Sequence, residues 1–121
     1  PGCGHYITDA RSGLADVEGQ QSRLCFFGHT HEPLVLQRGV GKQEFTENAP
    51  AVLAPDGFYL INLGSVGQPR DGDPRASFGV YDQARGVVEL HRVEYDIPTA
   101  QAKILAANLP EILATRLSQG W

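Results

Sequence analysis

The sequence predicts a layered α/β protein that is mostly β-strand, with one helix near the N-terminus and helices at the C-terminus. Three observations indicate this class. Apolar residues recur at three- and four-residue steps near both ends of the chain, short apolar runs occupy its middle, and turn-forming residues separate those runs. The sequence has no internal repeat and no low-complexity segment, so a single packed unit over residues 1–121 is expected.

The first half of the chain predicts one helix and two or three strands. An apolar stripe predicts an amphipathic helix over Tyr6–Glu18, formed by Tyr6, Ala10, Leu14 and Val17. The run Leu24–Phe27 is typical of a strand buried on both faces, and Leu34–Leu36 suggests the next strand. The segment Gly39–Asp56 is rich in turn-forming residues and predicts at most one edge strand, near Phe45.

The second half predicts a strand, a long loop, a hairpin and two helices. The apolar run Phe58–Leu63 is the strand, and the loop follows it over Gly64–Pro74. Strands at Ser77–Tyr81 and Val87–Tyr95 flank a turn over Asp82–Gly86. A helix is expected from Pro98 and a shorter helix from Pro110.

Composition argues against two classes of partner. With a net charge of -4 and no cluster of Lys and Arg, the chain lacks the basic face that nucleic-acid binding usually needs. No stretch approaches the roughly 20 apolar residues that span a bilayer, so no membrane partner and a cytoplasmic location are expected. A small phosphorylated substrate stays open, because one site can be locally positive within an acidic protein.

The chain has two cysteines, Cys3 and Cys25, which are too few for a disulfide framework. Because Cys25 lies inside the apolar run Leu24–Phe27, we expect a buried, reduced thiol.

A histidine pair directly follows the first expected strand, in the sequence Gly28-His29-Thr30-His31. Neutral imidazoles are common ligands of transition metals, and two of them separated by one residue can converge on neighbouring ions. Gly28 would let the backbone turn sharply before them. The alternative is a surface turn with two solvated histidines.

A second polar stretch, Asn62–Arg70, begins at the end of the strand Phe58–Leu63. Its glycines expose backbone N–H groups that suit an anion, Asn62 can brace a ligand, and Arg70 can meet phosphate oxygens with two parallel hydrogen bonds. An ordinary loop with Arg70 in solvent is the alternative.

Taken in order, Phe27–Pro33 and Asn62–Arg70 resemble the closing part of the calcineurin-like metallophosphoesterases, especially their small bacterial and archaeal phosphodiesterase branch. The ending Ala100–Gly120 is similar to the tail of that branch. This resemblance covers nearly the whole chain. It implies a layered α/β/β/α sandwich, of which residues 1–121 would be the C-terminal half of one domain. Leu63 departs from the proline of many members, which changes loop stiffness but no ligand.

The resemblance implies a metal-dependent phosphoesterase. His29 and His31 would each bind one of two divalent transition-metal ions, either Mn, Fe, Zn or Ni. A hydroxide bridging those ions would hydrolyse a phosphodiester or phosphomonoester bond of a small phosphorylated substrate. The residues that would shape the phosphate pocket are Asn62, Gly64, Ser65 and Arg70. The general acid is unassigned.

The family's Asp-X-His and Gly-Asn-His-Asp/Glu motifs do not occur in the sequence, and no Gly-Asp step precedes the histidine pair. The resemblance implies that they belong to an N-terminal half, which would be the partner of this segment and without which it would be inactive. An apolar edge left open there would favour association with another chain, including a homo-oligomer. The competing hypothesis is a metallophosphoesterase-like scaffold that binds proteins without catalysis.

Other candidate ligands have simpler interpretations. A structural zinc site formed by Cys3, Cys25, His29 and His31 has suitable ligand types but no Cys-X-X-Cys pair. His5 is expected to be solvated, and His91 to be a cross-strand neighbour. Asp71 and Asp73 fit turn chemistry better than a metal loop.

Overall fold

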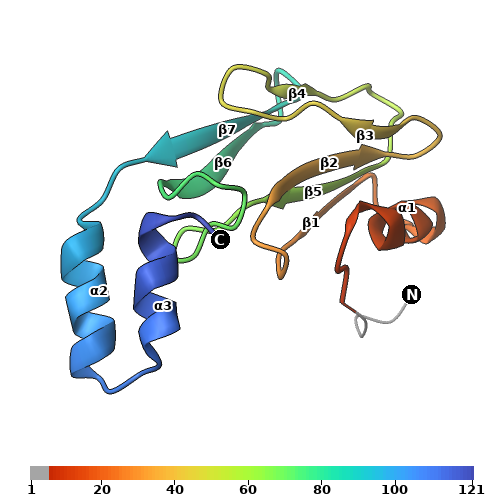
Figure 1. The fold of residues 1–121 in the computed structure, drawn as a ribbon. Helices are drawn as coiled ribbons and strands as arrows, with labels where there is room; N and C mark the ends of the chain where they lie inside the picture. Colours follow the sequence, from red (N-terminus) through yellow and green to blue (C-terminus); the bar gives the residue numbers. More distant parts are fainter. Residues whose placement is uncertain (1–5) are drawn as a thin grey trace.

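The computed structural model describes residues 6–121, and three layers follow one another in it: a helix, a four-stranded sheet and a three-stranded sheet, with a helical hairpin at the C-terminal end (Figure 1). The expected mixed α/β class is confirmed. The elements are α1 Ala10–Gly19, β1 Leu24–Phe27, β2 Pro33–Gln37, β3 Gly41–Gln43, β4 Ala51–Val52, β5 Tyr59–Leu63, β6 Ala76–Asp82, β7 Val87–Val93, α2 Ile97–Ala106, α3 Glu111–Thr115 and the 3-10 helix η1 Arg116–Ser118.

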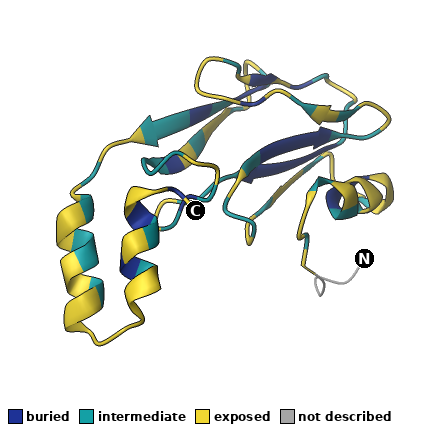
Figure 2. Ribbon diagram, in the orientation of Figure 1, coloured by how far each residue is buried: buried dark blue, intermediate teal, exposed yellow. Residues whose placement is uncertain are grey.

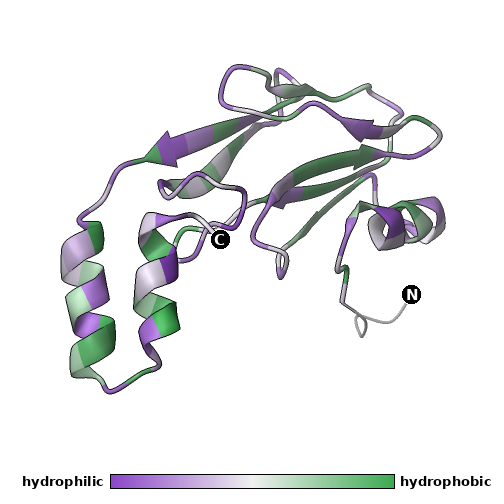
Figure 3. Ribbon diagram, in the orientation of Figure 1, coloured by the Kyte–Doolittle hydropathy of each residue, from purple (hydrophilic) through white to green (hydrophobic). Residues whose placement is uncertain are grey.

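The four-stranded sheet has the order β1-β5-β2-β3 and is covered on one face by α1. β1 runs parallel to β5, and the other neighbouring strands are antiparallel. Helix and sheet share a cluster of buried side chains, Val17, Leu34, Leu36 and Leu60. In Figure 3 the strands β2 and β5 are largely hydrophobic, as expected for central strands covered on both faces.

Helix α1 begins at Ala10, so the expected start at Tyr6 is wrong. Asp9 is the N-cap, and its side-chain carboxylate accepts a 2.7 Å hydrogen bond from the backbone N–H of Ser12. In return, the Ser12 hydroxyl accepts one from the Asp9 N–H. This reciprocal capping box marks the N-terminal end of the helix, and Tyr6 lies in the segment before it.

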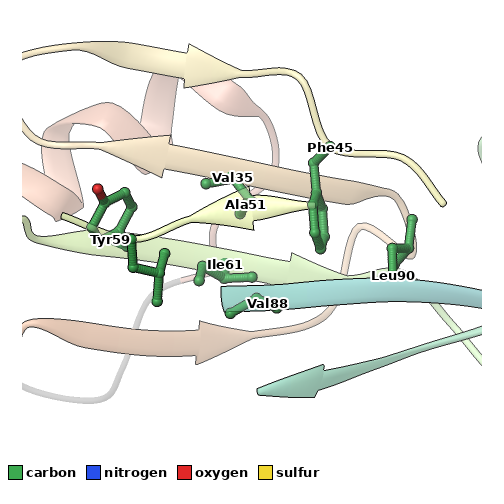
Figure 4. Close-up of a cluster of buried hydrophobic side chains, with 8 residues drawn as sticks. Val35, Phe45, Ala51, Tyr59, Ile61, Val88 and Leu90 are labelled. Atoms are coloured by element: carbon green, nitrogen blue, oxygen red, sulfur yellow. The ribbon is translucent and has the colours of Figure 1, made fainter. Parts of the chain in front are cut away.

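The main core lies between the two sheets (Figure 4). β2 and β5 contribute side chains from one sheet, and β4 and β7 contribute from the other, whose order is β4-β7-β6. The fully or nearly buried members are Val35, Phe45, Ala51, Leu53, Tyr59, Ile61, Val88 and Leu90. The sequence predicts at most one edge strand near Phe45. Instead, two short strands, β3 and β4, flank its loop, and each pairs at the edge of a different sheet.

β1 is an edge strand, which corrects the expectation of a strand buried on both faces. Its only partner within residues 6–121 is β5, and Phe26 is 45% exposed. Cys25, expected to be buried, is a free and exposed cysteine. An apolar run of four residues has the same composition in a central strand and in an edge strand, so its position came only from the structure.

The hairpin β6–β7 forms as expected and places His91 opposite Phe78. Their rings stack with centroids 5.2 Å apart, which confirms His91 as a cross-strand neighbour. Val52, Phe78 and Val80 are exposed on the outer face of the three-stranded sheet.

The C-terminal helices α2 and α3 form a hairpin beyond the end of β7 (Figure 1). No residue of α2 is buried, and the helix is coloured mainly as exposed in Figure 2. The second arm carries the buried residues Ala114 and Leu117, and beyond it Gly72 donates a backbone hydrogen bond to the Gly120 carbonyl. Among the helices of residues 6–121, none combines the length and apolarity needed to cross a bilayer.

Candidate metal and phosphate site

The two polar loops singled out in the sequence lie at the same end of the four-stranded sheet. β1 and β5 are parallel, and their last paired residues are Phe27 and Asn62. The loop that carries His29 and His31 therefore leaves the sheet beside the loop Gly64–Arg70. Carboxyl ends of neighbouring parallel strands are where open α/β sheets place their ligand sites.

Both histidines adopt left-handed backbone conformations, with φ of 79° at His29 and 62° at His31. The third such non-glycine residue in the described chain is Asn108, which follows α2, where this conformation is common. Residues other than glycine adopt the left-handed conformation at a cost of about 1–2 kcal/mol. Strained residues of this kind cluster at functional sites, so the pair is a candidate for function on conformational grounds.

Gly28 does not make the sharp turn, contrary to expectation. It lies outside the positive-φ glycines, and a Cβ added there would meet no atom within 4 Å. The histidines themselves carry the unusual backbone angles.

His31 is oriented by the second loop. Its Nδ1 lies 2.8 Å from the carbonyl oxygen of Gln68. Because a carbonyl only accepts, Nδ1 carries the proton, and in the neutral ring Nε2 is left with a free electron pair. Metal-binding histidines are commonly held in this way, with one ring nitrogen donating to a carbonyl and the other facing the ion. His29 is exposed, and its ring lies 4.3 Å from that of Tyr6.

Asn62 is fully buried and braces both loops. Its side-chain amide donates to the carbonyl of Gly28 and to the Thr30 hydroxyl, at 3.3 and 3.0 Å. Its side-chain oxygen accepts from the backbone N–H of Gly64 at 2.9 Å. The side chain therefore fixes the histidine loop against the second loop and has no exposed atom for a ligand.

Gly64 and Ser65 shape the second loop from within. Gly64 has φ of 79°, and a Cβ there would come within 2.7 Å of the Ser77 hydroxyl. The Ser65 hydroxyl accepts a hydrogen bond from the Gln68 N–H at 3.0 Å, which holds the residue whose carbonyl orients His31.

Arg70 borders a concavity of about 460 Å³ that also contains His29. Its backbone N–H donates to the His31 carbonyl at 3.2 Å, and its Nη2 donates to the Gln68 side chain at 2.6 Å. Its Nε is buried with no hydrogen-bond partner among the described residues. Arg70 is partly exposed, so the accessible part of its guanidinium could bind a phosphate oxygen.

Asp71 and Asp73 are held by arginines. Asp71 pairs with Arg92, and Asp73 pairs with Arg75 at 2.6 Å. The hydrogen bonds from Arg75 lower the pKa of Asp73 below its usual value. Asp73 also accepts from the Arg75 backbone N–H at 3.0 Å, a turn contact that agrees with the simpler interpretation of this segment.

Within residues 6–121, no group of three or more His, Cys, Asp and Glu side chains is arranged to hold a metal ion. His29 and His31 are therefore a partial ligand set. Cys3 and His5 lie outside the described residues, and with Cys25 exposed on β1 nothing in the described part draws the proposed zinc ligands together. Sequence reasoning missed Gln68 and Tyr6 as neighbours of the histidines, because a carbonyl contact and a ring contact leave no motif.

Comparison with known proteins agrees with this fold. No protein-family model matches the chain. A crystal structure of a metallophosphoesterase from Sphaerobacter thermophilus superimposes with a TM-score of 0.85 at 40% identity, over 96% of this chain and 49% of that one. The uncharacterized protein MJ0912 of Methanocaldococcus jannaschii is 43% identical over 97 residues, which are 80% of this chain and 39% of that protein. The hypothetical protein PH1004 from Pyrococcus horikoshii OT3 shares the fold, with a TM-score of 0.67 at 20% identity, over 98% of this chain and 42% of that one.

The chain thus has part of the metallophosphoesterase fold, and the resemblance seen in its two motifs is confirmed. It is a relative of the Sphaerobacter thermophilus metallophosphoesterase and of the archaeal protein MJ0912. It spans about half the length of the first and less than half of the second.

Proposed function

We propose that this chain contributes two histidine ligands and an anion-binding loop to a two-metal phosphoesterase centre that hydrolyses phosphomonoester or phosphodiester bonds. The observation that carries the proposal is the state of His31. Its Nδ1 donates to the Gln68 carbonyl, its Nε2 is free to bind an ion, and its backbone is held in a strained conformation beside His29.

The chemistry of the donor set fits divalent transition metals. Imidazole nitrogens suit Mn, Fe, Zn and Ni, and the proposed centre needs further ligands besides these two. When bound, such ions supply Lewis-acid chemistry, making water more acidic and offsetting negative charge on phosphoryl oxygens.

The residues of this chain have three roles in the proposal. His29 and His31 hold the metals, and Asn62 keeps their loop in place from beneath. Arg70 positions the phosphate by donating to its oxygens from the wall of the same concavity. Gly64 and Ser65 give the second loop the shape that brings Gln68 to His31.

The remaining ligands would come from a further segment that packs on the open side of β1. Two features support this part of the proposal. β1 presents an edge without a partner strand in the described part of the chain. The exposed ring of Phe26 lies 6.4 Å from that of Tyr81, so apolar side chains of both sheets meet on that side. Adding strands to an open edge satisfies its backbone groups and covers such side chains.

Metal content and phosphatase activity of the full-length protein test the proposal together. We expect close to two transition-metal ions per chain and hydrolysis of p-nitrophenyl phosphate or bis-p-nitrophenyl phosphate. His31→Ala should lose one ion and most of the activity. His91→Gln, on the outer face of the other sheet, is the matched control and should keep both.

A full-length protein that binds no metal and hydrolyses neither ester would contradict the proposal and favour the non-catalytic scaffold. Normal turnover and metal content in His31→Ala would also contradict it.

A further inference from the structure

A second concavity of about 550 Å³ adjoins the one that contains His29. Four residues line both: Glu32, Pro33, Lys42 and Arg70. The two hollows therefore form one groove, which runs from the histidine loop across this shared wall toward Arg92. A groove of this length exceeds what a single phosphate group would need.

Three carboxylates, Glu47, Asp71 and Asp73, line the far part of the groove, and each is paired with an arginine. Arg92, whose side chain is only 5% exposed, pairs with Asp71. Arg75 bridges Asp73 and Glu47, at 2.6 and 2.7 Å. These carboxylates are neutralised locally, so they neither bind cations nor strongly repel an anion.

The shared wall differs, because its cations lack carboxylate partners. Among the described residues, neither Lys42 nor Arg70 forms an ion pair, and the side chain of Arg70 donates to the neutral amide of Gln68. Glu32 is the only carboxylate on this wall, so its net charge is positive.

Lys42 belongs to the short edge strand β3 and is paired with Leu36. Leu36 packs in the cluster beneath α1, so Lys42 lies on the α1 face of the sheet, where the first concavity opens. The chain has only two lysines, Lys42 and Lys103, and one of them stands at the junction of the groove.

We infer that Lys42, acting with Arg70, is a specificity-determining residue for substrates that carry a second anionic group, such as a second phosphate, beyond the scissile phosphate. This inference rests on the proposed function for the position of the scissile phosphate. Arg70 serves the phosphate near the histidines, and Lys42 offers a mobile ammonium, suited to a second phosphate or a carboxylate at the junction.

The test compares ligands with one and two phosphates on the metal-loaded, full-length protein. Inorganic phosphate and pyrophosphate are titrated calorimetrically, and each is also measured as an inhibitor of p-nitrophenyl phosphate hydrolysis. Lys42→Gln should weaken pyrophosphate binding about fivefold, the value of one exposed charged contact, and change phosphate binding less than twofold. Turnover of p-nitrophenyl phosphate should be unchanged. Lys103→Gln removes the same charge on α2, away from the groove, and should leave both affinities unchanged.

Equal effects of Lys42→Gln on phosphate and pyrophosphate, or no effect on either, would overturn the inference. A lysine on an edge strand can also serve only to discourage strand pairing between molecules. In that case Lys42→Gln would leave both affinities intact and increase self-association in analytical ultracentrifugation. Hydrolysis of p-nitrophenyl phosphate by the unaltered protein distinguishes failure of the proposed function from failure of the inference. If the unaltered protein does not hydrolyse this ester, the proposed function is contradicted. If it does, and Lys42→Gln has no effect on either affinity, only the inference is contradicted.

Discussion

The strained backbone of His29 predicts that glycine at this position gives a more stable fold than alanine does. His29→Gly removes an exposed side chain whose one ring contact within residues 6–121 is with Tyr6, itself 72% exposed. It also relieves the left-handed conformation at φ of 79°, which glycine adopts freely. His29→Ala removes the same ring but keeps the strain, so the pair of variants isolates the backbone contribution.

The magnitude follows from two opposing effects. Relief of the left-handed conformation contributes about 1–2 kcal/mol. The greater freedom of glycine in the unfolded chain costs about 0.5–1 kcal/mol. His29→Gly should therefore be more stable than His29→Ala by about 0.75 kcal/mol at the middle of these ranges, or a few degrees in Tm for a chain of this length.

Circular dichroism during urea unfolding measures the difference in stability between the two variants. A chelator is present so that metal binding does not contribute. Gln83 supplies the control, because it is exposed in the β6–β7 turn and is absent from the residues with positive φ. There the order should reverse, with Gln83→Gly less stable than Gln83→Ala. If His29→Gly is no more stable than His29→Ala, the histidine is not strained and the conformational argument for the site is refuted.

Three further predictions concern the loops and their surroundings. Gly64→Ala should lower the free energy of unfolding in urea by about 2 kcal/mol or more, because its Cβ would meet Ser77 at 2.7 Å and φ is positive. The control is Gly28→Ala, where a Cβ meets open space and stability should be unchanged or higher. Asn62→Leu should lower the free energy of unfolding by about 3 kcal/mol, because three hydrogen bonds are lost. It should also weaken metal binding, measured by equilibrium dialysis, at least tenfold. A change in stability without a change in metal affinity would refute the role of Asn62 as a brace. Asp73→Asn should be less stable than the unaltered protein by about 1 kcal/mol at neutral pH. Because the folded pKa of Asp73 is lowered, that advantage is complete above the usual carboxyl pKa and disappears as the pH falls through the lower folded value; a difference that persists in strong acid would contradict this.

Much of the fold could be predicted from local patterns. The apolar runs within β2 and β5 predicted central strands correctly, because strands covered on both faces are rich in apolar residues. The turn Asp82–Gly86 between two β-rich segments located the hairpin equally well. The start of α1 was missed although the signal was present. Asp9 and Ser12 have the spacing of a capping box, but the apolar stripe extended the helix back to Tyr6.

The position of β1 could not be read in the same way. Leu24–Phe27 is apolar enough for a central strand, and its exposure depends on which strands flank it, a property of the whole sheet.

Some residues of the candidate site could be predicted from the sequence, and others only from the fold. The two motifs identified His29, His31, Asn62 and Arg70 because each follows directly from a strand end, and parallel pairing of β1 with β5 brings those ends together. Whether these residues bind metal and phosphate is a prediction for the experiments above. The groove shared by Lys42 and Arg70 had no sequence signal, since the residues are far apart in the chain and only the fold places them on one wall.

The C-terminal hairpin has a consequence for local unfolding. α2 packs against α3 and η1 and has no buried residue, whereas α3 and η1 contain the buried residues Ala114 and Leu117. Opening α2 therefore exposes little apolar surface and leaves both sheets intact, so its free energy of opening is well below that of global unfolding. Native-state hydrogen exchange should show the amides of Ile97–Ala106 exchanging first and those of β5 last. Lys103, exposed on α2, is then where trypsin should first cut the folded chain, at a place far from the histidine loop.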